Sequence, residues 1–137
     1  MDLTPDALNE LMRPLFPGLM GMRVVEVTPE RVVGKMMVRA DLCTTGDVLH
    51  GGAIMAFADT LGGVATFANL PAGARTVTIE SKTNFVGAAA VDTEVTGECT
   101  PFHRGRTTMV WQTQIRSADG KLCAVVSQTQ MVIKPPT

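Results

Sequence analysis

Asp59 is the one charged residue in the run Gly51–Asn69, which otherwise consists of apolar and small residues. A run that is apolar on all sides predicts a helix that protein covers on nearly every face. A carboxylate in such surroundings is costly unless it is hydrogen-bonded, paired or neutralised. Active sites use such placements to prepare a group for proton transfer or nucleophilic attack. We therefore expect Asp59 to carry the chemistry of this chain.

The predicted helix opens with His50, Gly51 and Gly52. The N–H groups of a first helical turn have no partner within the helix, and glycine lets a ligand approach the backbone closely. With the positive end of the helix dipole, this start could stabilise a carbonyl oxygen that becomes negative. The two glycines could equally serve only a tight turn from loop to helix, and the residues alone leave both readings open.

The spacing of Gly51 and Asp59 limits how they can cooperate. Eight residues separate them, so on a straight helix they lie about 12 Å apart along the axis. An oxyanion donor and a nucleophile that serve one carbonyl must both lie within about 3 Å of the reacting atoms. Two antiparallel helices from two-fold-related subunits meet this condition, whereas one helix does not. If both residues are catalytic, the chain is an obligate dimer with shared sites.

Several further elements must position this helix. Thr4 as N-cap and Pro5 at the first helical position predict a short N-terminal helix that ends at Pro14. Apolar runs and alternation predict strands, and a Ser-Ala-Asp-Gly sequence predicts a hairpin turn over residues 117–120. The predicted strands span residues 22–27, 32–38, 76–86, 92–101, 107–117 and 122–133.

One face of the predicted strand 107–117 is polar, with Gln112 and Gln114 alternating with apolar residues, and we expect Gln128 and Gln130 to continue this polar face on the last strand. The order of a short helix, two strands, a long helix and four strands predicts an α+β fold. In it, a single curved antiparallel sheet wraps around the apolar helix. Whatever the sheet leaves uncovered should face a partner.

Composition narrows the class of protein. The 137 residues predict a single domain over 1–137, and a net charge of -1 with 4% aromatic residues argues against partners such as nucleic acid or an anionic membrane surface. No apolar stretch reaches the about 18 residues of a membrane span. Cys43, Cys99 and Cys123 are odd in number and lack metal-ligand spacing, so we expect reduced cysteines, no metal and a cytoplasmic location.

Two motifs carry a resemblance to a known family. The segment Leu49–Ala53 (LHGGA), followed by Asp59–Gly63 (DTLGG), resembles the hotdog-fold acyl-CoA thioesterases of the phenylacetate-degradation and 4-hydroxybenzoyl-CoA thioesterase type. The resemblance continues through Asn84–Gly87 and His103–Thr107 and covers residues 20–133. It implies a curved antiparallel sheet of five to six strands around one long central helix, and a homodimer with shared active sites that often pairs into a homotetramer.

The resemblance also implies roles for individual residues. Asp59 is the nucleophile or the general base that activates water, Gly51 offers its N–H to the thioester oxygen, and His50 shapes and polarises that pocket. Thr78 falls where similar enzymes keep a hydroxyl beside the acyl group or water, although it could be an ordinary strand residue. Gly52 and Phe85, which lie in matching segments, are expected to contact the substrate.

The chain departs from the family pattern at two positions. Thr44 stands six residues before the histidine, where similar proteins often carry Asn or Gln to position the substrate or water. Gly63 stands where some relatives carry Ser or Thr. Both departures bear on which groups position the water and on which substrate is bound. They bear less on the type of reaction.

The turn His103-Arg104-Gly105-Arg106 suits the phosphates of coenzyme A through charge-assisted hydrogen bonds, with Lys82 in support. A solvated basic hairpin tip is the alternative. The resemblance thus implies an acyl-CoA thioesterase that needs no cofactor, since the CoA moiety is part of the substrate. A hotdog enoyl-thioester hydratase or dehydratase, and an acyl-CoA-binding module without turnover, are the other candidates.

Overall fold

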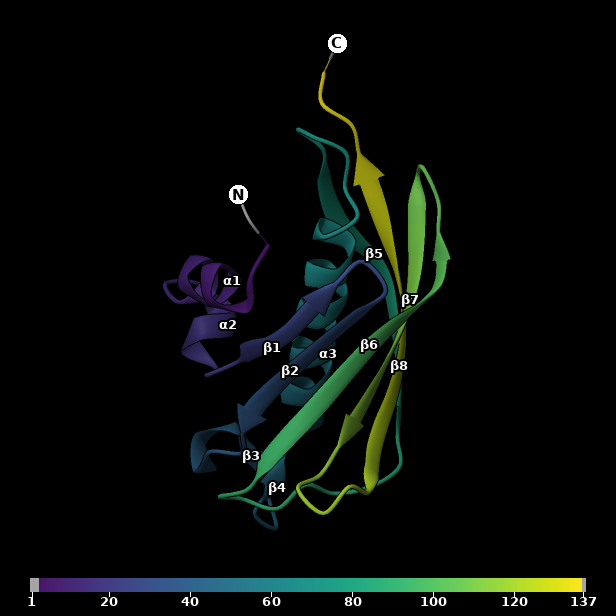
Figure 1. Cartoon of the computed structure of the whole chain (residues 1–137). Coiled ribbons are helices and arrows are strands. Elements are labelled where there is room, and N and C mark those ends of the chain that lie inside the picture. The colour runs from purple at the N-terminus through teal and green to yellow at the C-terminus, as the bar shows by residue number, and fades with distance from the viewer. Residues whose placement is uncertain (1–2, 137) are drawn as a thin grey trace.

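The computed structural model describes residues 3–136. One long helix, α3 (Gly51–Phe67), lies in the hollow of a curved six-stranded antiparallel sheet (Figure 1), as the pattern of apolar residues predicted. Across the sheet the strands follow the order β1 (Arg23–Thr28), β2 (Arg31–Met37), β6 (Glu94–Arg104), β7 (Thr108–Arg116), β8 (Leu122–Ile133) and β5 (Arg75–Phe85).

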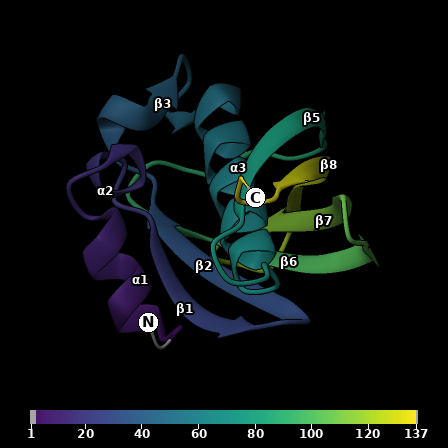
Figure 2. The ribbon, with the colours of Figure 1, turned by 90° about the horizontal axis from the view of Figure 1, so that it is seen from above.

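Two short helices precede the sheet in the chain, and the first of them packs against the edge strand β1. Helix α1 (Pro5–Met12) is capped by the Thr4 hydroxyl, which accepts a hydrogen bond from the Ala7 N–H at 3.1 Å. Helix α2 (Phe16–Leu19) follows it, and Figure 2 shows both on the side of β1 and α3 away from β5. Sequence patterns did not predict α2, the 3-10 turn η1 (Ala40–Leu42) or the hairpin of β3 (Cys43–Thr44) and β4 (Val48–Leu49). No helix within residues 3–136 is long and apolar enough to cross a membrane.

Two glycines let α3 pack closely on the sheet. Gly34 on β2 and Gly97 on β6 lie directly opposite each other. A Cβ at either position would come within 2.6 Å of the Leu61 side chain, so the pair makes a depression that Leu61 and Phe57 fill. Both side chains are fully buried there. Close packing of this kind is where a protein interior is most sensitive to a change in volume.

The structure corrects the predicted orientation of two glutamines. Gln128 lies opposite Trp111 on the neighbouring strand, and Trp111 faces the helix. Since residues directly opposite each other share a face, Gln128 and Gln130 point into the core, with exposed fractions of 0% and 1%. The expectation that they continue the polar outer face of β7 is wrong, because the alternation of β8 follows Ala124 and Val126 into the core.

Strand β5 forms one edge of the sheet, and its outer edge has no strand beside it within residues 3–136. Its apolar residues Val77 and Ile79 are 46% and 54% exposed. The pairing with β8 shifts by one residue between Thr78 and Glu80, which makes Ile79 the extra residue of a β-bulge. Thr78 lies opposite Gln130 before the bulge, and Ser81 lies opposite Gln128 after it.

Candidate active site

Asp59 lies midway along α3 on a side of the helix that the sheet does not reach. Asp59 is exposed in the single chain, so its expected burial is not met within one chain. This side of the helix is the part that the sheet leaves uncovered. Met55 and Phe67, at the same helical spacing, are also exposed, each at 40%. We call the residues Gly52, Met55, Asp59, Gly63 and Phe67 the open stripe of α3.

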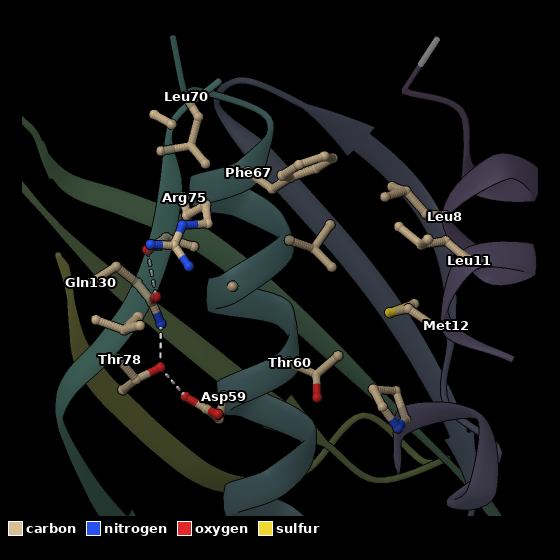
Figure 3. Close-up of a pocket in the computed structure, with 16 residues that line it drawn as sticks. Leu8, Leu11, Met12, Asp59, Thr60, Phe67, Leu70, Arg75, Thr78 and Gln130 are labelled. Carbon is tan, nitrogen blue, oxygen red and sulfur yellow. Dashed lines mark hydrogen bonds between the residues drawn. The ribbon is translucent and has the colours of Figure 1, made fainter. Parts of the chain in front are cut away.

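The Asp59 carboxylate has one hydrogen-bond partner that the sequence had singled out. The Thr78 hydroxyl on β5 donates to Asp59 Oδ1 at 2.6 Å, and the Gln130 side-chain amide donates to Thr78 Oγ1 at 2.6 Å. Figure 3 shows the three side chains as one connected row between the helix and the strand. The structure therefore brings Thr78 to Asp59, and it adds Gln130, which sequence reasoning assigned to the wrong face.

The row continues into the core. Gln130 Nε2 also donates to Gln128 Oε1 at 2.7 Å, and Gln128 Nε2 donates to the Ala58 carbonyl at 2.8 Å. Both glutamines lie on the same face of β8 as the buried residues Ala124, Val126 and Val132. The alternation of β8 could have shown that both glutamines lie on its core-facing side. Two amides in such positions require hydrogen-bond partners, because a buried amide without them is costly.

An apolar groove opens beside the carboxylate. It has a volume of about 540 Å³ and runs between α1, α3 and β5. Figure 3 shows Asp59 and Thr78 on one side of it, with the side chains of α1 facing them. Its volume and apolar walls suit an acyl or aryl group whose reacting carbonyl lies at Asp59. The apolar residues that line it are Leu8, Leu11, Met12, Pro17, Val64, Phe67, Leu70, Ala74 and Val77.

His50 forms the N-cap of α3. Its Nδ1 accepts a hydrogen bond from the Gly52 N–H at 2.7 Å, so in the neutral ring the proton lies on Nε2. A Cβ on Gly52 would come within 3.0 Å of the same nitrogen, so a larger residue there would crowd the His50 ring. Within residues 3–136 the Gly51 N–H has no acceptor, which leaves it available to a ligand. The Phe85 ring covers Gly51, with atoms 3.1 Å from where a Cβ would be.

Within one chain, the helix start at His50–Gly52 and the Asp59 carboxylate border different hollows. His50 and Gly52 line a second hollow, of about 430 Å³, which is bordered by α2, η1 and the start of α3. Asp59 and Thr78 line the first groove, and the two hollows share no residue. Gly51 and Asp59 belong to one helix of 17 residues, so the about 12 Å between them cannot close within the chain.

The two arginines of the basic turn, residues 103–106, differ in their contacts within the protein. Arg104 Nη1 lies 3.2 Å from the Pro29 carbonyl and 3.4 Å from Asn69 Oδ1, and an ion pair with Glu30 spans 3.6 Å. The protein itself thus uses much of this guanidinium. Arg106 carries no such ion pair within the described part of the chain. The turn itself is Gly105–Thr107, since His103 and Arg104 still belong to β6.

The basic turn lines a third hollow, of about 810 Å³. Arg104, Gly105, Arg106 and Lys134 contribute to its walls, and Lys134 was not among the residues that the sequence had indicated. Three cations around one hollow form an arrangement that can hold phosphate groups. None of its lining residues also borders the groove at Asp59.

Thr44 and Lys82 lie apart from Asp59. Thr44 is exposed in the β3–β4 hairpin before α3. Lys82 lies opposite Ser127 on the outer face of the sheet, whereas α3 packs on the inner face. Gly63 borders the groove, with no atom within 4 Å of where a Cβ would be. No cluster of three His, Cys, Asp or Glu side chains suited to a metal ion is present among residues 3–136.

Comparisons with known proteins agree on one family. The profile of the Thioesterase superfamily matches residues 46–124. The chain is 28% identical over 131 residues to the 1,4-dihydroxy-2-naphthoyl-CoA hydrolase of Escherichia coli, and the match covers 96% of each chain.

Solved structures show the same architecture. A thioesterase from Haemophilus influenzae superposes with a TM-score of 0.92 at 29% identity, which covers 98% of this chain and 93% of that one. The PaaI protein of the phenylacetic acid degradation operon of Escherichia coli superposes with a TM-score of 0.83 at 20% identity, over 93% and 89% of the two chains. At that identity the second match shows the fold alone. These matches confirm the hotdog fold that the sequence motifs had indicated.

Proposed function

Because the chain belongs to the Thioesterase superfamily and is a thioester hydrolase, we propose that it hydrolyses CoA thioesters of acyl or aryl acids with Asp59 as the reacting carboxylate. The observation that carries this assignment is the position of Asp59, at the edge of an apolar groove with one oxygen held by Thr78. The relative from Escherichia coli is named for a CoA thioester of an aromatic acid, which supports CoA as the leaving group.

Asp59 can act in either of two ways. As a general base it takes a proton from water while the water oxygen attacks the thioester carbon. As a nucleophile it attacks that carbon itself and forms a mixed anhydride, which water then cleaves. In both routes the carbonyl oxygen becomes negative, the C–S bond breaks and the CoA thiolate leaves and is protonated. The Gly51 N–H and the dipole of the helix start are the groups that can stabilise the oxyanion.

We place each oxyanion donor on the neighbouring copy of the chain. Met55 lies midway between Gly51 and Asp59 on α3. If two α3 helices cross antiparallel at Met55, Gly51 of one subunit lies opposite Asp59 of the other, and the two-fold axis creates two such sites. The open stripe of α3 and the exposed apolar residues of the β5 edge support this pairing, because both lack a cover in the single chain.

Substitution of Asp59 tests its role. Asp59→Asn keeps the size and the hydrogen-bond acceptor but removes the charge, so kcat should fall by roughly 10³-fold or more while the melting temperature stays near that of the wild type. The assay is release of free CoA from a panel of acyl-CoA and aroyl-CoA substrates. Asp6→Asn on the exposed side of α1 is the matched control. Near-normal turnover by Asp59→Asn would remove this residue from the mechanism.

Complementation tests the shared site. Gly51→Pro deletes the N–H, and proline is favoured at the first helical position. Its Cβ also crowds the Phe85 ring at 3.1 Å, so the homodimer alone does not isolate the N–H and the heterodimer carries the test. His50 has φ -63° and ψ 138°, which a residue before proline adopts readily. Gly51→Pro and Asp59→Asn should each be inactive as homodimers. A heterodimer of the two, purified through two tags, should recover about half of the wild-type activity, since one of its two sites has both native residues.

A site contained in one chain gives the opposite result. In that case the heterodimer stays inactive, because neither chain has both residues. Sedimentation velocity on the same samples measures the oligomeric state, including the further pairing of dimers into a tetramer that the family resemblance implies.

The basic turn is our candidate for the nucleotide end of the substrate. Arg104 is held by contacts within the protein, so Arg106 and Lys134 are the cations of this hollow that we expect to bind phosphate. Arg106→Ala should raise KM for an acyl-CoA several-fold but leave KM for the matching N-acetylcysteamine thioester unchanged, because only CoA carries phosphates. Equal effects on both substrates would contradict the assignment.

The proposal includes no metal or redox cofactor, and dialysis against EDTA should therefore leave kcat unchanged. It also places the protein in the cytoplasm. Cys43, Cys99 and Cys123 are free, which supports a reducing compartment. Burial raises the pKa of the Cys99 thiol to about 12, so this cysteine should resist alkylation in the folded protein.

A further inference from the structure

The side-chain amides of Gln128 and Gln130 are buried next to the apolar core, yet they connect to the candidate catalytic group. Their hydrogen bonds form a row from the Ala58 carbonyl through Gln128, Gln130 and Thr78 to the Asp59 carboxylate. The row thus begins and ends at consecutive residues of α3. Since a buried amide is stabilised only when its polar atoms find partners, the direction of each bond in the row can be derived.

The Ala58 carbonyl sets the direction because it can only accept. Gln128 must therefore turn its nitrogen to Ala58, at 2.8 Å, which leaves its oxygen facing Gln130. That oxygen requires a donor, so Gln130 places its nitrogen between Gln128 Oε1 and Thr78 Oγ1. Both hydrogens of this nitrogen are then used.

Thr78 has one hydroxyl hydrogen. Its oxygen accepts from Gln130, so the hydrogen is directed to Asp59 Oδ1 at 2.6 Å. Oδ1 is thereby held, and Oδ2 remains for the reaction. The Thr76 hydroxyl lies 2.9 Å from both Gln130 Oε1 and the Met131 carbonyl, so it is compatible with this arrangement but does not set its direction.

We propose that Gln130, held by Gln128, is a positioning residue that fixes the Thr78 hydroxyl as a donor to Asp59 Oδ1 and so makes Oδ2 the reacting oxygen. The inference rests on the proposed role of Asp59 in thioester hydrolysis. Gln130 acts through Thr78 and does not touch the substrate carbonyl.

Helix α3 provides the space that this row needs. A Cβ on Gly62 would come within 2.2 Å of Gln128 Cδ, so the helix carries a glycine in its interior where the amide lies against it. Glycine in a helix interior is unfavourable compared with alanine. An apolar side chain at position 128 would fill the same core without requiring hydrogen bonds, which is why we assign the amides a role beyond packing.

A double-mutant cycle tests the proposal. Gln130→Met keeps the length of the side chain but removes both donors, and Thr78→Val keeps the shape but removes the hydroxyl. We expect Gln130→Met to lower kcat about tenfold with KM changed less than about twofold. In the Thr78→Val background the same change should have no further effect on kcat, because Gln130 then has no hydroxyl to direct.

Additive effects in the cycle would overturn the proposal, and so would a Gln130→Met enzyme with wild-type kcat. Gln112→Met is the matched control: Gln112 lies opposite Ser127 on the outer face of the sheet, away from Asp59, and its substitution should leave kcat unchanged. Melting temperatures of all variants separate a loss of fold from a loss of positioning.

Gln130→Glu gives a second test that needs no change of shape. The neutral acid has one hydrogen, against the two of the amide, and can donate it either to Thr78 or to Gln128 Oε1. The carboxylate can only accept and would draw the Thr78 hydrogen away from Asp59. The ratio of its kcat to that of the wild type should therefore fall as pH rises from 5 to 9. Asp59 and Arg75 are the other ionisable groups that line the same groove, and both are present in the two enzymes compared. A ratio that does not change with pH contradicts the proposal.

The same variants separate the catalytic role of Asp59 from the positioning role of Gln130. If Asp59→Asn keeps wild-type activity, the proposed function fails and the positioning role falls with it. If Asp59→Asn is inactive but the Gln130 and Thr78 effects are additive, the catalytic carboxylate stands and only the positioning role is wrong.

Discussion

The two sides of α3 differ in what they contact. On the covered side, Phe57 and Leu61 fill the depression over Gly34 and Gly97. On the other side, the open stripe exposes Met55, Asp59 and Phe67. One helix thus stabilises the sheet with one side and presents the candidate reactive group with the other. A substitution should therefore change stability or activity depending on the side it alters.

The row of hydrogen bonds from Ala58 to Asp59 links the two sides. Gln128 reaches the covered side at Ala58 and Gly62, and Thr78 reaches the open stripe at Asp59. This difference suggests three experiments, which we order by their expected effect on activity.

The largest effect is expected on the open stripe. Met55→Glu places two carboxylates at the proposed two-fold axis, so the subunits should separate and kcat/KM should fall on the order of 10³-fold, because each site loses its oxyanion donor. Sedimentation equilibrium and the CoA-release assay measure the two effects. Met37→Glu, at a similarly exposed methionine of β2, is the control. A Met55→Glu protein that stays dimeric and active would mean that the open stripe is not the interface.

An intermediate effect is expected where the two sides are linked. Gly62→Ala adds a methyl group that must displace Gln128, so kcat should fall about tenfold and the free energy of unfolding should fall by about 1–3 kcal/mol. Combining it with Gln128→Ala makes room for the methyl group. In that background Gly62→Ala should no longer destabilise the protein, as chemical denaturation can measure. A cost that persists there would show that Gln128 is not the group displaced.

The smallest effect on activity is expected on the covered side. Leu61→Ala leaves a cavity over the two sheet glycines, so the free energy of unfolding should fall by about 2–5 kcal/mol. The kcat of the folded protein should stay within about twofold, since Leu61 does not line the groove and its side chain packs on the sheet glycines. Loss of activity in a fully folded Leu61→Ala protein would show that the two sides of the helix are not separable.

Much of the fold could be predicted because its signals are local. The long apolar run, the six alternating segments and the caps at Thr4 and Pro5 are each visible within a few residues. The order of elements and the wrapped sheet follow from them. Helix α2 was missed because a four-residue helix with Pro17 and Gly18 has almost no periodicity to detect.

The candidate site was predictable only in part. His50, Gly51 and Asp59 stood out by type and spacing, and Thr78 entered through the family resemblance. The contact between Thr78 and Asp59 depends on strand pairing across 19 residues, which local patterns do not encode. Gln130 was assigned to the outer face because its chemistry matched Gln112, whereas the parity of β8 is set by the apolar residues around it. The exposure of Asp59 was missed because an all-apolar helix does not reveal which side the sheet leaves open.

The bulge at Ile79 has a consequence for variation in chain length. Deleting one residue from a strand usually turns all later side chains to the opposite face. In β5 the pairs on both sides of Ile79 already match their partners on β8 without it, from Arg75–Thr78 and from Glu80–Phe85. A chain that lacks this residue could keep Thr78 inward and the Phe85 ring on Gly51. Position 79 is therefore a place where this sheet can tolerate the loss of an amino acid.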